Sequence, residues 1–540
     1  AVARSSRLVG QIPGYVSRAL STQMEPREQM EYDVVIVGGG PAGLSAAIRL
    51  KQLELEKGRE VSVCVVEKGS ELGAHILSGN VFEPRALDEL LPDWREDETC
   101  PLKTKVTRDS FRFLTASSSV PLPTPPVLHN EGNYIASLSQ VVRWLGERAE
   151  ALGVEIYPGF AAAEVLYDDD GVRGVATRDS GLDKTGQPKE SFERGVELVA
   201  RQTLFAEGAK GSCSESVIDH YELRKDKAEQ SYGLGIKEVW EIPVAQCEPG
   251  RVEHTLGWPL SSDVYGGSFL YHTAPNLVYI GLVVGLDYAN PHLSPYKEFQ
   301  RLKHHPHIAA QLEGGECVAY GARVINEGGW QAVPKLTFPG GALIGCSAGF
   351  VNVPKIKGTH TAMKSAMLAA DAVFDLLETD QKEAVAYQTA LDSSWVADEL
   401  KAVRNYKPAF EEYGLYVGMV YSGLTAYILR GNEPWTLGAG KKTRDAETTA
   451  KADDPRAVLI EYPKPDNVLS FPLLESLSRT SVTHEDQPSH LRVKPDIAGV
   501  TTGRSLREYA GPERNFCPAG VYEYSDDDSL VVNAQNCIHC

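Results

Sequence analysis

Three cysteines after residue 516 have the spacing of metal ligands. Cys517 is followed by Pro518, and Cys537 and Cys540 form a C-x-x-C step that lets two thiolates reach one metal centre. Three interpretations compete: ligands of a 4Fe–4S cluster that needs a fourth thiolate, ligands of a structural zinc ion with His539 or a borrowed group, and unligated thiols. The tight grouping of the thiols favours the cluster.

A glycine-rich loop near residue 40 has the pattern of a dinucleotide-binding turn. The apolar run 32–37 leads into it, a helical stretch follows, and Glu67 ends the next apolar run, where it can accept hydrogen bonds from ribose hydroxyls. Gly38 suits the tight turn, Gly40 the approach of a pyrophosphate, and Gly43 close packing of helix on strand. The predicted dinucleotide contacts are Val37, Gly38, Gly39, Gly40, Pro41, Ala42, Gly43, Leu44, Ser45, Ala46 and Glu67.

A second glycine-rich stretch indicates that the dinucleotide is FAD rather than NAD. Residues 343–349 end a strand, and a helix opens after a lysine-bearing loop. Many FAD enzymes place such an element against the ribityl chain and pyrophosphate, with an Asp where this chain has Cys346. Residues 203–209 resemble the middle strand of the same layout, with Glu207 in place of the usual Asp. Three elements in this order predict FAD, bound also by Gly345, Gly349, Gly358 and Thr359.

Composition and charge exclude some classes of partner. With 540 residues the chain has room for three to four domains. Its 54 Lys and Arg stand against 73 Asp and Glu, which gives a net charge of −19 and argues against nucleic acid. Motifs typical of hydrolases are not found, so the chemistry is expected to come from the cofactors.

The first residues have the composition of a mitochondrial transit peptide. Residues 1–24 contain no acidic side chain, and Arg4, Arg7 and Arg18 lie among serines. A basic tail without a targeting role is the alternative.

Four stretches of the chain lack charged residues over a length that a membrane helix would need. Residues 264–286 predict a β-hairpin and residues 336–354 a strand, turn and strand, because Pro and Gly interrupt both. Prolines exclude a helix over residues 113–130. Residues 413–429 would form a helix of about 25 Å, shorter than the roughly 30 Å hydrocarbon core. Their tyrosines suit the membrane surface, with an ordinary buried helix as the alternative.

Four segments together resemble the electron-transfer flavoprotein:ubiquinone oxidoreductase family: residues 38–43, 265–272, 352–365 and 533–540. The resemblance runs from about residue 30 to the end. It implies a mixed α/β fold (α/β with α+β parts): a Rossmann-like FAD domain, an inserted β-rich quinone-binding domain and a C-terminal ferredoxin-like iron–sulfur domain. The expected bounds are a leader at 1–28, a discontinuous FAD domain at 29–379 with the quinone-binding domain at about 238–338, a helical membrane-surface segment at 380–432, and the 4Fe–4S domain at 433–540.

The resemblance also implies the activity. Electrons from reduced electron-transfer flavoprotein would pass through the 4Fe–4S cluster and FAD to ubiquinone, on a monotopic protein at the matrix side of the mitochondrial inner membrane. Cys517, Cys537 and Cys540 would be cluster ligands, and Gly266 and Gly267 would contact the quinone headgroup through their backbone. Residues 111–127 and 413–429 would face the membrane. No side chain is expected to act as a catalytic acid or base.

One departure from the family keeps other hypotheses open. The family motif continues C-x-x-C-x-x-C, so a fourth cysteine is expected beyond residue 540. One alternative is an FAD-dependent reductase or hydroxylase of a lipid-like substrate with a structural zinc tail. The other is a cluster-deficient chain that binds FAD and a partner without turnover.

Overall fold

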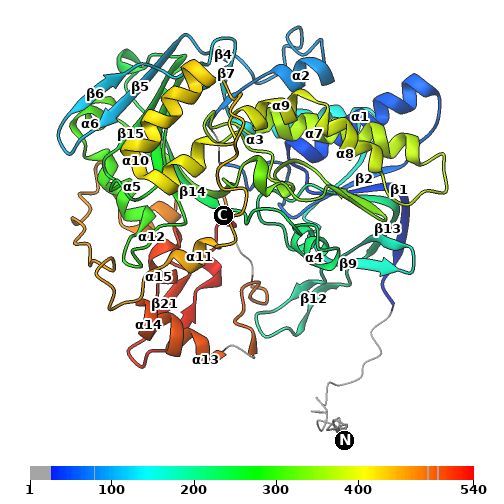
Figure 1. Cartoon of the computed structure of the whole chain (residues 1–540). Helices are drawn as coiled ribbons and strands as arrows, with labels where there is room; N and C mark the ends of the chain where they lie inside the picture. Colours follow the sequence, from blue (N-terminus) through cyan, green and yellow to red (C-terminus); the bar gives the residue numbers. More distant parts are fainter. Residues whose placement is uncertain (1–25, 78, 483–485, 496–497) are drawn as a thin grey trace, which may run out of the picture.

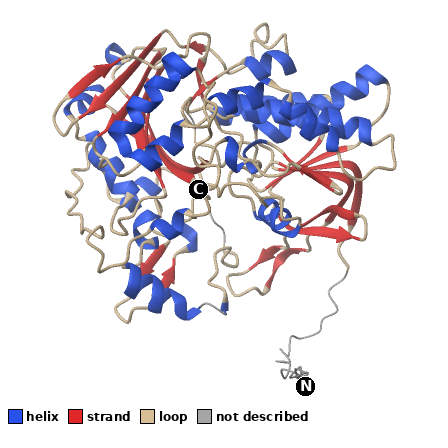
Figure 2. Ribbon diagram, in the orientation of Figure 1, coloured by secondary structure: helices blue, strands red, loops and turns tan. Residues whose placement is uncertain are grey.

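The computed structural model contains two large β-sheets, each with its own helices, and a loop-rich C-terminal region (Figure 1). It describes residues 26–77, 79–482, 486–495 and 498–540. Most of the leader expected at residues 1–28 therefore lies outside the described residues. In Figure 2 the first sheet lies under a layer of helices, and the second forms the opposite side of the molecule.

The first sheet is mainly parallel, in the order β19-β20-β13-β1-β2-β8, with β10 paired to β13 and β9 to β10. Val34, Val35 and Ile36 in its central strand are fully buried, as expected for a parallel strand covered on both faces. The strands are β1 (Gln29–Val37), β2 (Val63–Glu67), β8 (Glu155–Pro158), β9 (Ala162–Asp168), β10 (Gly171–Thr177), β13 (Glu197–Phe205), β19 (Thr337–Phe338) and β20 (Gly341–Leu343). The predicted β–α–β unit and the strand–turn–strand at residues 336–354 are confirmed.

Helices α1 and α7 pack together on this sheet and carry the two glycine-rich elements at their N-termini. Helix α1 (Pro41–Lys57) is capped by Gly58, whose left-handed backbone (φ 65°) lets its N–H donate to the Glu54 carbonyl oxygen. The helices of this half are α1 (Pro41–Lys57), α2 (Arg85–Leu90), α3 (Leu138–Ala151), α4 (Ser212–His220), α7 (Thr359–Leu376), α8 (Val385–Asp392) and α9 (Trp395–Ala402).

The second sheet has the order β18-β14-β17-β16-β15-β5-β6 and is antiparallel except between β15 and β5. It contains the hairpin predicted at residues 264–286. Its strands are β5 (Arg108–Leu114), β6 (Ser119–Leu122), β14 (Tyr232–Glu241), β15 (Arg251–Gly257), β16 (Gly266–Thr273), β17 (Leu277–Gly285) and β18 (Glu316–Asn326), with α5 (Pro295–Lys303) and α6 (Pro306–Leu312) alongside.

Helix α10 (Tyr406–Leu424) continues as a π-helical turn, Thr425–Leu429, and is kinked at Gly414. Among the described residues, no helix is both long and apolar enough to cross a membrane.

The C-terminal region contains α11 (Asp445–Thr448), α12 (Leu473–Leu477), α13 (Ala498–Val500), α14 (Arg507–Tyr509), α15 (Glu513–Phe516), β21 (Tyr522–Tyr524) and β22 (Leu530–Val532). Short ladders elsewhere are β3 (Asn80–Phe82), β7 (Tyr134–Ala136) and β4 (Thr104–Lys105), and β11 (Ser180–Leu182) with β12 (Pro188–Glu193).

Candidate functional site

The first glycine loop joins β1 to α1 by a turn that only glycine accommodates. Gly38 has φ 110°, and a Cβ there would lie 2.5 Å from the Ala206 carbonyl oxygen. A Cβ at Gly43 would lie 2.0 Å from the Gly38 carbonyl oxygen, whereas one at Gly40 would meet nothing within 4 Å. Turn and close helix packing are thus as predicted, and open space lies over Gly40, where a pyrophosphate would sit.

Two features complete this half of the dinucleotide site. Glu67 accepts hydrogen bonds from the backbone N–H groups of Gly39 (3.0 Å) and Gly69 (2.8 Å), and its oxygens retain lone pairs for ribose hydroxyls. The N-terminus of α1 has no side-chain cap, so its dipole is available to a phosphate. The side chains of Val37, Leu44, Ser45 and Ala46 are buried beneath the loop and support it from below.

The second glycine-rich element lies directly against the first. Gly345 has φ 60°, and a Cβ there would lie 2.7 Å from the Ala42 Cβ and 3.3 Å from the Ala362 Cβ. Gly358 is the N-cap of α7, again without a side-chain cap, and Thr359 is its first residue. The N-termini of α1 and α7 therefore converge on one place, which fits one dinucleotide bound between them.

Glu207 has a local task that the sequence did not reveal. Its carboxylate accepts hydrogen bonds from Ser214 Oγ (2.6 Å) and from the N–H groups of Cys213 (3.3 Å) and Ser214 (2.5 Å). Burial raises the pKa of Glu207, and the Ser214 hydrogen bonds oppose that shift. Glu207 thus accepts hydrogen bonds from backbone N–H groups in the first turn of α4 that would otherwise lack partners in the helix.

The three C-terminal cysteines come together beside the second sheet. Cys517 is buried, and Cys537 and Cys540 pack against the same apolar cluster. Burial, with the charges of the two other cysteines adding to it, raises the pKa of Cys540 to about 12. The N–H of Val521 donates to Cys517 Sγ and the N–H of His539 to Cys537 Sγ, both over 3.4 Å. Converging thiols with N–H donors fit an iron–sulfur cluster.

A histidine group lies at the same place. Ligand atoms of His490, Cys537 and His539 all lie within 4.8 Å of one another. This arrangement could also hold a zinc ion, so geometry alone leaves the zinc alternative standing.

Arg323 links the cysteine tail to the FAD half of the molecule. Its guanidinium donates to the carbonyl oxygen of His539 (2.6 Å) and to that of His75 (2.7 Å). His539 lies between Cys537 and Cys540, and His75 follows shortly after β2. The predicted cluster loop is therefore held against the domain that carries the glycine loops.

The two glycines predicted at the quinone site begin β16. A Cβ at Gly266 would lie 2.2 Å from the Val283 carbonyl oxygen, and one at Gly267 would lie 2.5 Å from the Thr255 carbonyl oxygen. Neighbouring strands thus already require glycine at both positions. Both residues remain partly exposed, so their backbone is accessible from outside the sheet.

The two segments predicted at the membrane lie side by side. The rings of Phe113 and Tyr416 are 6.5 Å apart, and Tyr427 Oη donates to the Thr124 carbonyl oxygen over 3.3 Å. Large apolar side chains exposed along these segments are Val120, Tyr413, Tyr416, Val417, Val420, Leu424, Tyr427 and Ile428. Because so many exposed large apolar side chains on two neighbouring segments are unusual on a soluble surface, this apolar patch indicates an interaction site.

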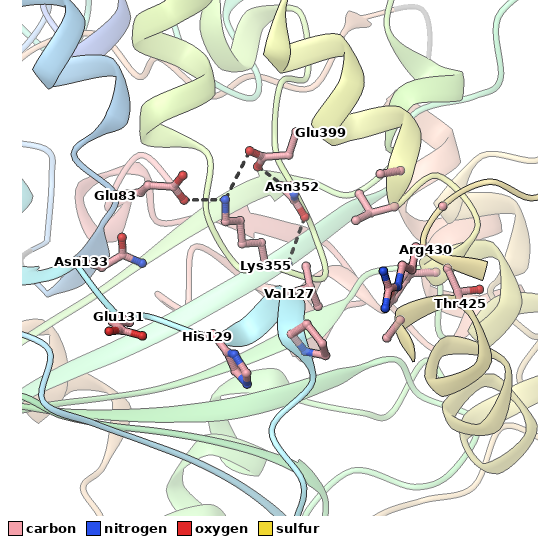
Figure 3. A pocket seen from close by; sticks show the side chains of 16 residues that line it. Glu83, Val127, His129, Glu131, Asn133, Asn352, Lys355, Glu399, Thr425 and Arg430 are labelled. Atoms are coloured by element: carbon pink, nitrogen blue, oxygen red, sulfur yellow. Dashed lines mark hydrogen bonds and ion pairs between the residues drawn. The ribbon is translucent and has the colours of Figure 1, made fainter. Parts of the chain in front are cut away.

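A cavity of about 460 Å³ opens beside these segments (Figure 3). Lys355 occupies its floor, 2.6 Å from Glu83 and 3.3 Å from Glu399. Asn352 donates to Glu399 over 2.8 Å. None of the residues predicted from the sequence to bind a cofactor or quinone lines this cavity. The carboxylates were missed because Glu83 and Glu399 lie far from the Lys355 loop in sequence.

Family models match three parts of the chain. Residues 36–92 match an NAD(P)-binding Rossmann-like domain, residues 232–325 "ETF-QO, ubiquinone-binding", and residues 467–540 "Electron transfer flavoprotein-ubiquinone oxidoreductase, 4Fe-4S". The mitochondrial electron transfer flavoprotein-ubiquinone oxidoreductase of Arabidopsis thaliana is 54% identical and aligns with 99% of this chain and 84% of its own length.

The chain belongs to the electron transfer flavoprotein-ubiquinone oxidoreductase family. The Mus musculus member is 53% identical, and the alignment covers 94% of this chain and 85% of that protein. The Dictyostelium discoideum member is 51% identical, and the alignment covers 96% of this chain and 88% of that protein. Among solved structures, a geranylgeranyl bacteriochlorophyll reductase-like protein of Thermoplasma acidophilum shares the fold, with a TM-score of 0.50 and 17% sequence identity. The superposition covers 75% of this chain and 90% of that one. Family membership confirms the predicted fold class and the cofactors FAD and 4Fe–4S, and it decides against zinc in the tail.

Proposed function

We propose that this chain transfers electrons from reduced electron-transfer flavoprotein, through a 4Fe–4S cluster and FAD, to ubiquinone in the mitochondrion, at the matrix side of the inner membrane. The observation that carries the proposal is the position of the cysteine tail. Arg323 ties the His539 carbonyl to the His75 carbonyl, so one side chain spans the cluster loop and the FAD half of the chain.

The residues of this chain place the cofactors and leave the redox chemistry to them. Cys517, Cys537 and Cys540 hold the cluster, and the N–H groups that donate to Cys517 and Cys537 Sγ stabilise negative charge there. The loop at Gly38, Gly39, Gly40, Pro41, Ala42 and Gly43 receives the pyrophosphate, Glu67 the ribose, and Gly345, Gly349, Gly358 and Thr359 the second side of FAD. When bound, the cluster and FAD supply one-electron and two-electron transfer.

Ubiquinone binds at the backbone of Gly266 and Gly267, in the segment that matches the ubiquinone-binding family model. The apolar patch along residues 111–127 and 413–429 rests on the membrane, where ubiquinone is dissolved. Val420 and Ile428 are 75% and 71% exposed, and their burial in the interface would favour attachment of the protein without a spanning helix.

The purified chain tests this function directly. We expect a flavin absorbance spectrum, a 4Fe–4S signal in electron paramagnetic resonance after reduction, and reduction of a short-chain ubiquinone that depends on electron-transfer flavoprotein. Cys537→Ser should lose the cluster signal and most of this activity while it keeps the flavin. A chain that contains both cofactors but does not reduce ubiquinone would contradict the proposal.

A further inference from the structure

A buried carboxyl group near the start of β16 has no role in the electron path. Glu327 follows the end of β18, and only 2% of its surface is exposed. Its Oε2 makes no hydrogen bond with any of the described residues. Burial raises the pKa of Glu327 to about 7, although the charge of Lys407 opposes the shift. A carboxyl group in this range can hold and release a proton near neutral pH.

Charged groups from three other elements surround Glu327. Lys407 of α10 lies with Nζ 4.0 Å from Glu327 Oε2 and 3.2 Å from Asp287 Oδ2, and it also pairs with Glu411. Asp445 of α11 lies close enough, like Asp287 and Glu411, to raise the pKa of Glu327 further. Lys441 Nζ lies 3.1 Å from Glu411 Oε1 and 4.0 Å from Asp445 Oδ1. The four carboxyl groups outnumber the two ammonium groups, and this excess of negative charge favours the protonated form of Glu327.

Strand pairing places this cluster at the quinone end of the sheet. Gly233 of β14 pairs with Gly285 of β17, whose N–H donates to the Tyr265 carbonyl oxygen over 2.8 Å. Tyr265 immediately precedes Gly266. A Cβ at Gly233 would lie 2.2 Å from Glu327 Oε1, so this glycine leaves the carboxyl group its space. The last residues of β18 and the first residues of β16 therefore lie at the same end of the strands in this sheet.

Tyr265 lies between the charged groups around Glu327 and the predicted quinone site. Its ring centroid lies 5.3 Å from Lys407 Nζ, and its ring packs edge-on against Phe410 of α10. Burial raises the pKa of the Tyr265 phenol, and the charge of Glu327 raises it further. Lys407 Nζ thus lies next to both groups, 5.3 Å from the Tyr265 ring centroid and 4.0 Å from Glu327 Oε2.

Water has room beside Glu327. A cavity of about 20 Å³ lies between the loop that follows β18 and the start of α10, and Glu327, Arg404 and Lys407 are among its lining residues. This volume suffices for one water molecule with polar partners. Among the other charged groups around Glu327, the side chains of Glu411 and Lys441 are about one fifth exposed. These charged groups therefore have contact with solvent.

Reduction of ubiquinone takes up two protons with its two electrons. We propose that Glu327 supplies one of these protons to ubiquinone bound at Gly266 and Gly267, acting through Tyr265; this inference rests on the proposed function. The phenol O–H bond breaks as an O–H bond forms at a quinone carbonyl oxygen that receives electrons from the cofactors. The phenol takes the proton of Glu327 in turn, Lys407 stabilises the carboxylate, and solvent returns a proton through Glu411 and Lys441.

Glu327→Gln tests the proposal in the complete enzyme with a short-chain ubiquinone as acceptor. We expect ubiquinone reduction to fall at least roughly tenfold, because loss of a proton donor costs about 10²–10⁴-fold when proton transfer limits the rate. Reduction of the enzyme's own cofactors by electron-transfer flavoprotein should remain unchanged. In the unmodified enzyme kcat/KM for ubiquinone should decline as the pH rises through about 7, since Glu327 must be protonated, and this decline should disappear in Glu327→Gln.

Two further variants keep the test decisive. Glu316→Gln, at the exposed opposite end of β18, should leave both the rate and the pH profile unchanged. Glu327→Asp keeps a titratable group at another position and should shift the decline to a different pH, which serves if the glutamine variant does not fold. An unchanged pH profile in the aspartate variant, or equal losses in both half-reactions of the glutamine variant, would overturn the relay. Failure of the unmodified enzyme to reduce ubiquinone would instead overturn the proposed function.

Discussion

Lys303 Nζ lies 2.8 Å from Glu238 Oε2 and 2.9 Å from Oε1, and both side chains are completely buried. Lys303 ends α5 and Glu238 lies in β14. The ammonium group also lies 4.8 Å from the centre of the Phe471 ring, in the C-terminal region. This ion pair therefore joins the second sheet, its helix and the region that carries the cysteines.

Lys303→Met should strongly destabilise the protein, because it leaves the Glu238 carboxylate buried without an opposite charge, held only by hydrogen bonds from Trp240 and Gln300. We expect a loss of about 3–5 kcal/mol in the free energy of unfolding, measured by urea denaturation. Adding Glu238→Leu should restore much of it, since the unpaired charge is then gone. Lys297→Met, on the exposed side of the same helix, is the control, and equal effects of Lys303→Met and Lys297→Met would show that the buried pair contributes little.

Local sequence was enough to predict the glycine-rich turns at which FAD binding is proposed. Gly38 and Gly43 act within a few residues of the turn they form, so their spacing carries the information. The hairpin at residues 264–286 was predictable for the same reason.

Long-range partners were not predictable. β5 pairs in parallel with β15, which places Phe111 opposite His254. No local pattern in either segment predicts that the two strands pair. Glu327 looks like any other glutamate in the sequence, and only the approach of α10 buries it next to Lys407.

Gly345→Val should weaken FAD binding. A Cβ at this position would lie 2.7 Å from the Ala42 Cβ in a left-handed backbone conformation, so the two glycine-rich elements would be pushed apart. Overpacking of this kind costs about 1–3 kcal/mol, or roughly 5- to 150-fold in affinity. Flavin absorbance per protein measures the effect. Gly440→Ala, where a Cβ meets nothing within 4 Å, should retain full flavin, and equal flavin in both variants would refute the proposed contact.

The double variant Val420→Glu, Ile428→Glu should release the protein from membranes. Both side chains project from the apolar patch, and burial of each is worth about 1.5–3 kcal/mol. Flotation with liposomes of mitochondrial lipid composition should fall at least roughly tenfold. Val244→Glu replaces an equally prominent valine, 68% exposed, in the second sheet's loops and should not change flotation. Loss of flotation in both proteins would point to net charge rather than to the patch.

The interactions of Glu399 with His360 and Lys355 should make the free energy of unfolding depend on pH. Burial favours a higher pKa for Glu399, but the hydrogen bond and charge of His360 and the charge of Lys355 outweigh it and lower the pKa from 4.5 to about 2. The carboxylate therefore stabilises the fold fully above about pH 4.5 and progressively less as the pH falls towards 2. Glu399→Gln should cost on the order of 3 kcal/mol at pH 7 and little at pH 2, in urea denaturation across pH. Glu412→Gln, exposed on α10, is the control, and a loss independent of pH would exclude ionisation as the cause.

Arg323→Gln should lower the reduction potential of the 4Fe–4S cluster. The positive charge of Arg323 opposes the raised pKa of Cys540, one of the three cysteines proposed to hold the cluster. An added electron is stabilised by a nearby positive charge, so its removal should shift the potential by about −30 to −60 mV, equivalent to roughly a three- to tenfold change in the reduction equilibrium. Redox titration followed by electron paramagnetic resonance measures the shift. Arg323→Lys keeps the charge but loses the fork that bridges the carbonyls of His539 and His75. If charge sets the potential, the lysine variant should stay near the original value; if it shifts as far as the glutamine variant, the bridging hydrogen bonds, and not the charge, control the cluster.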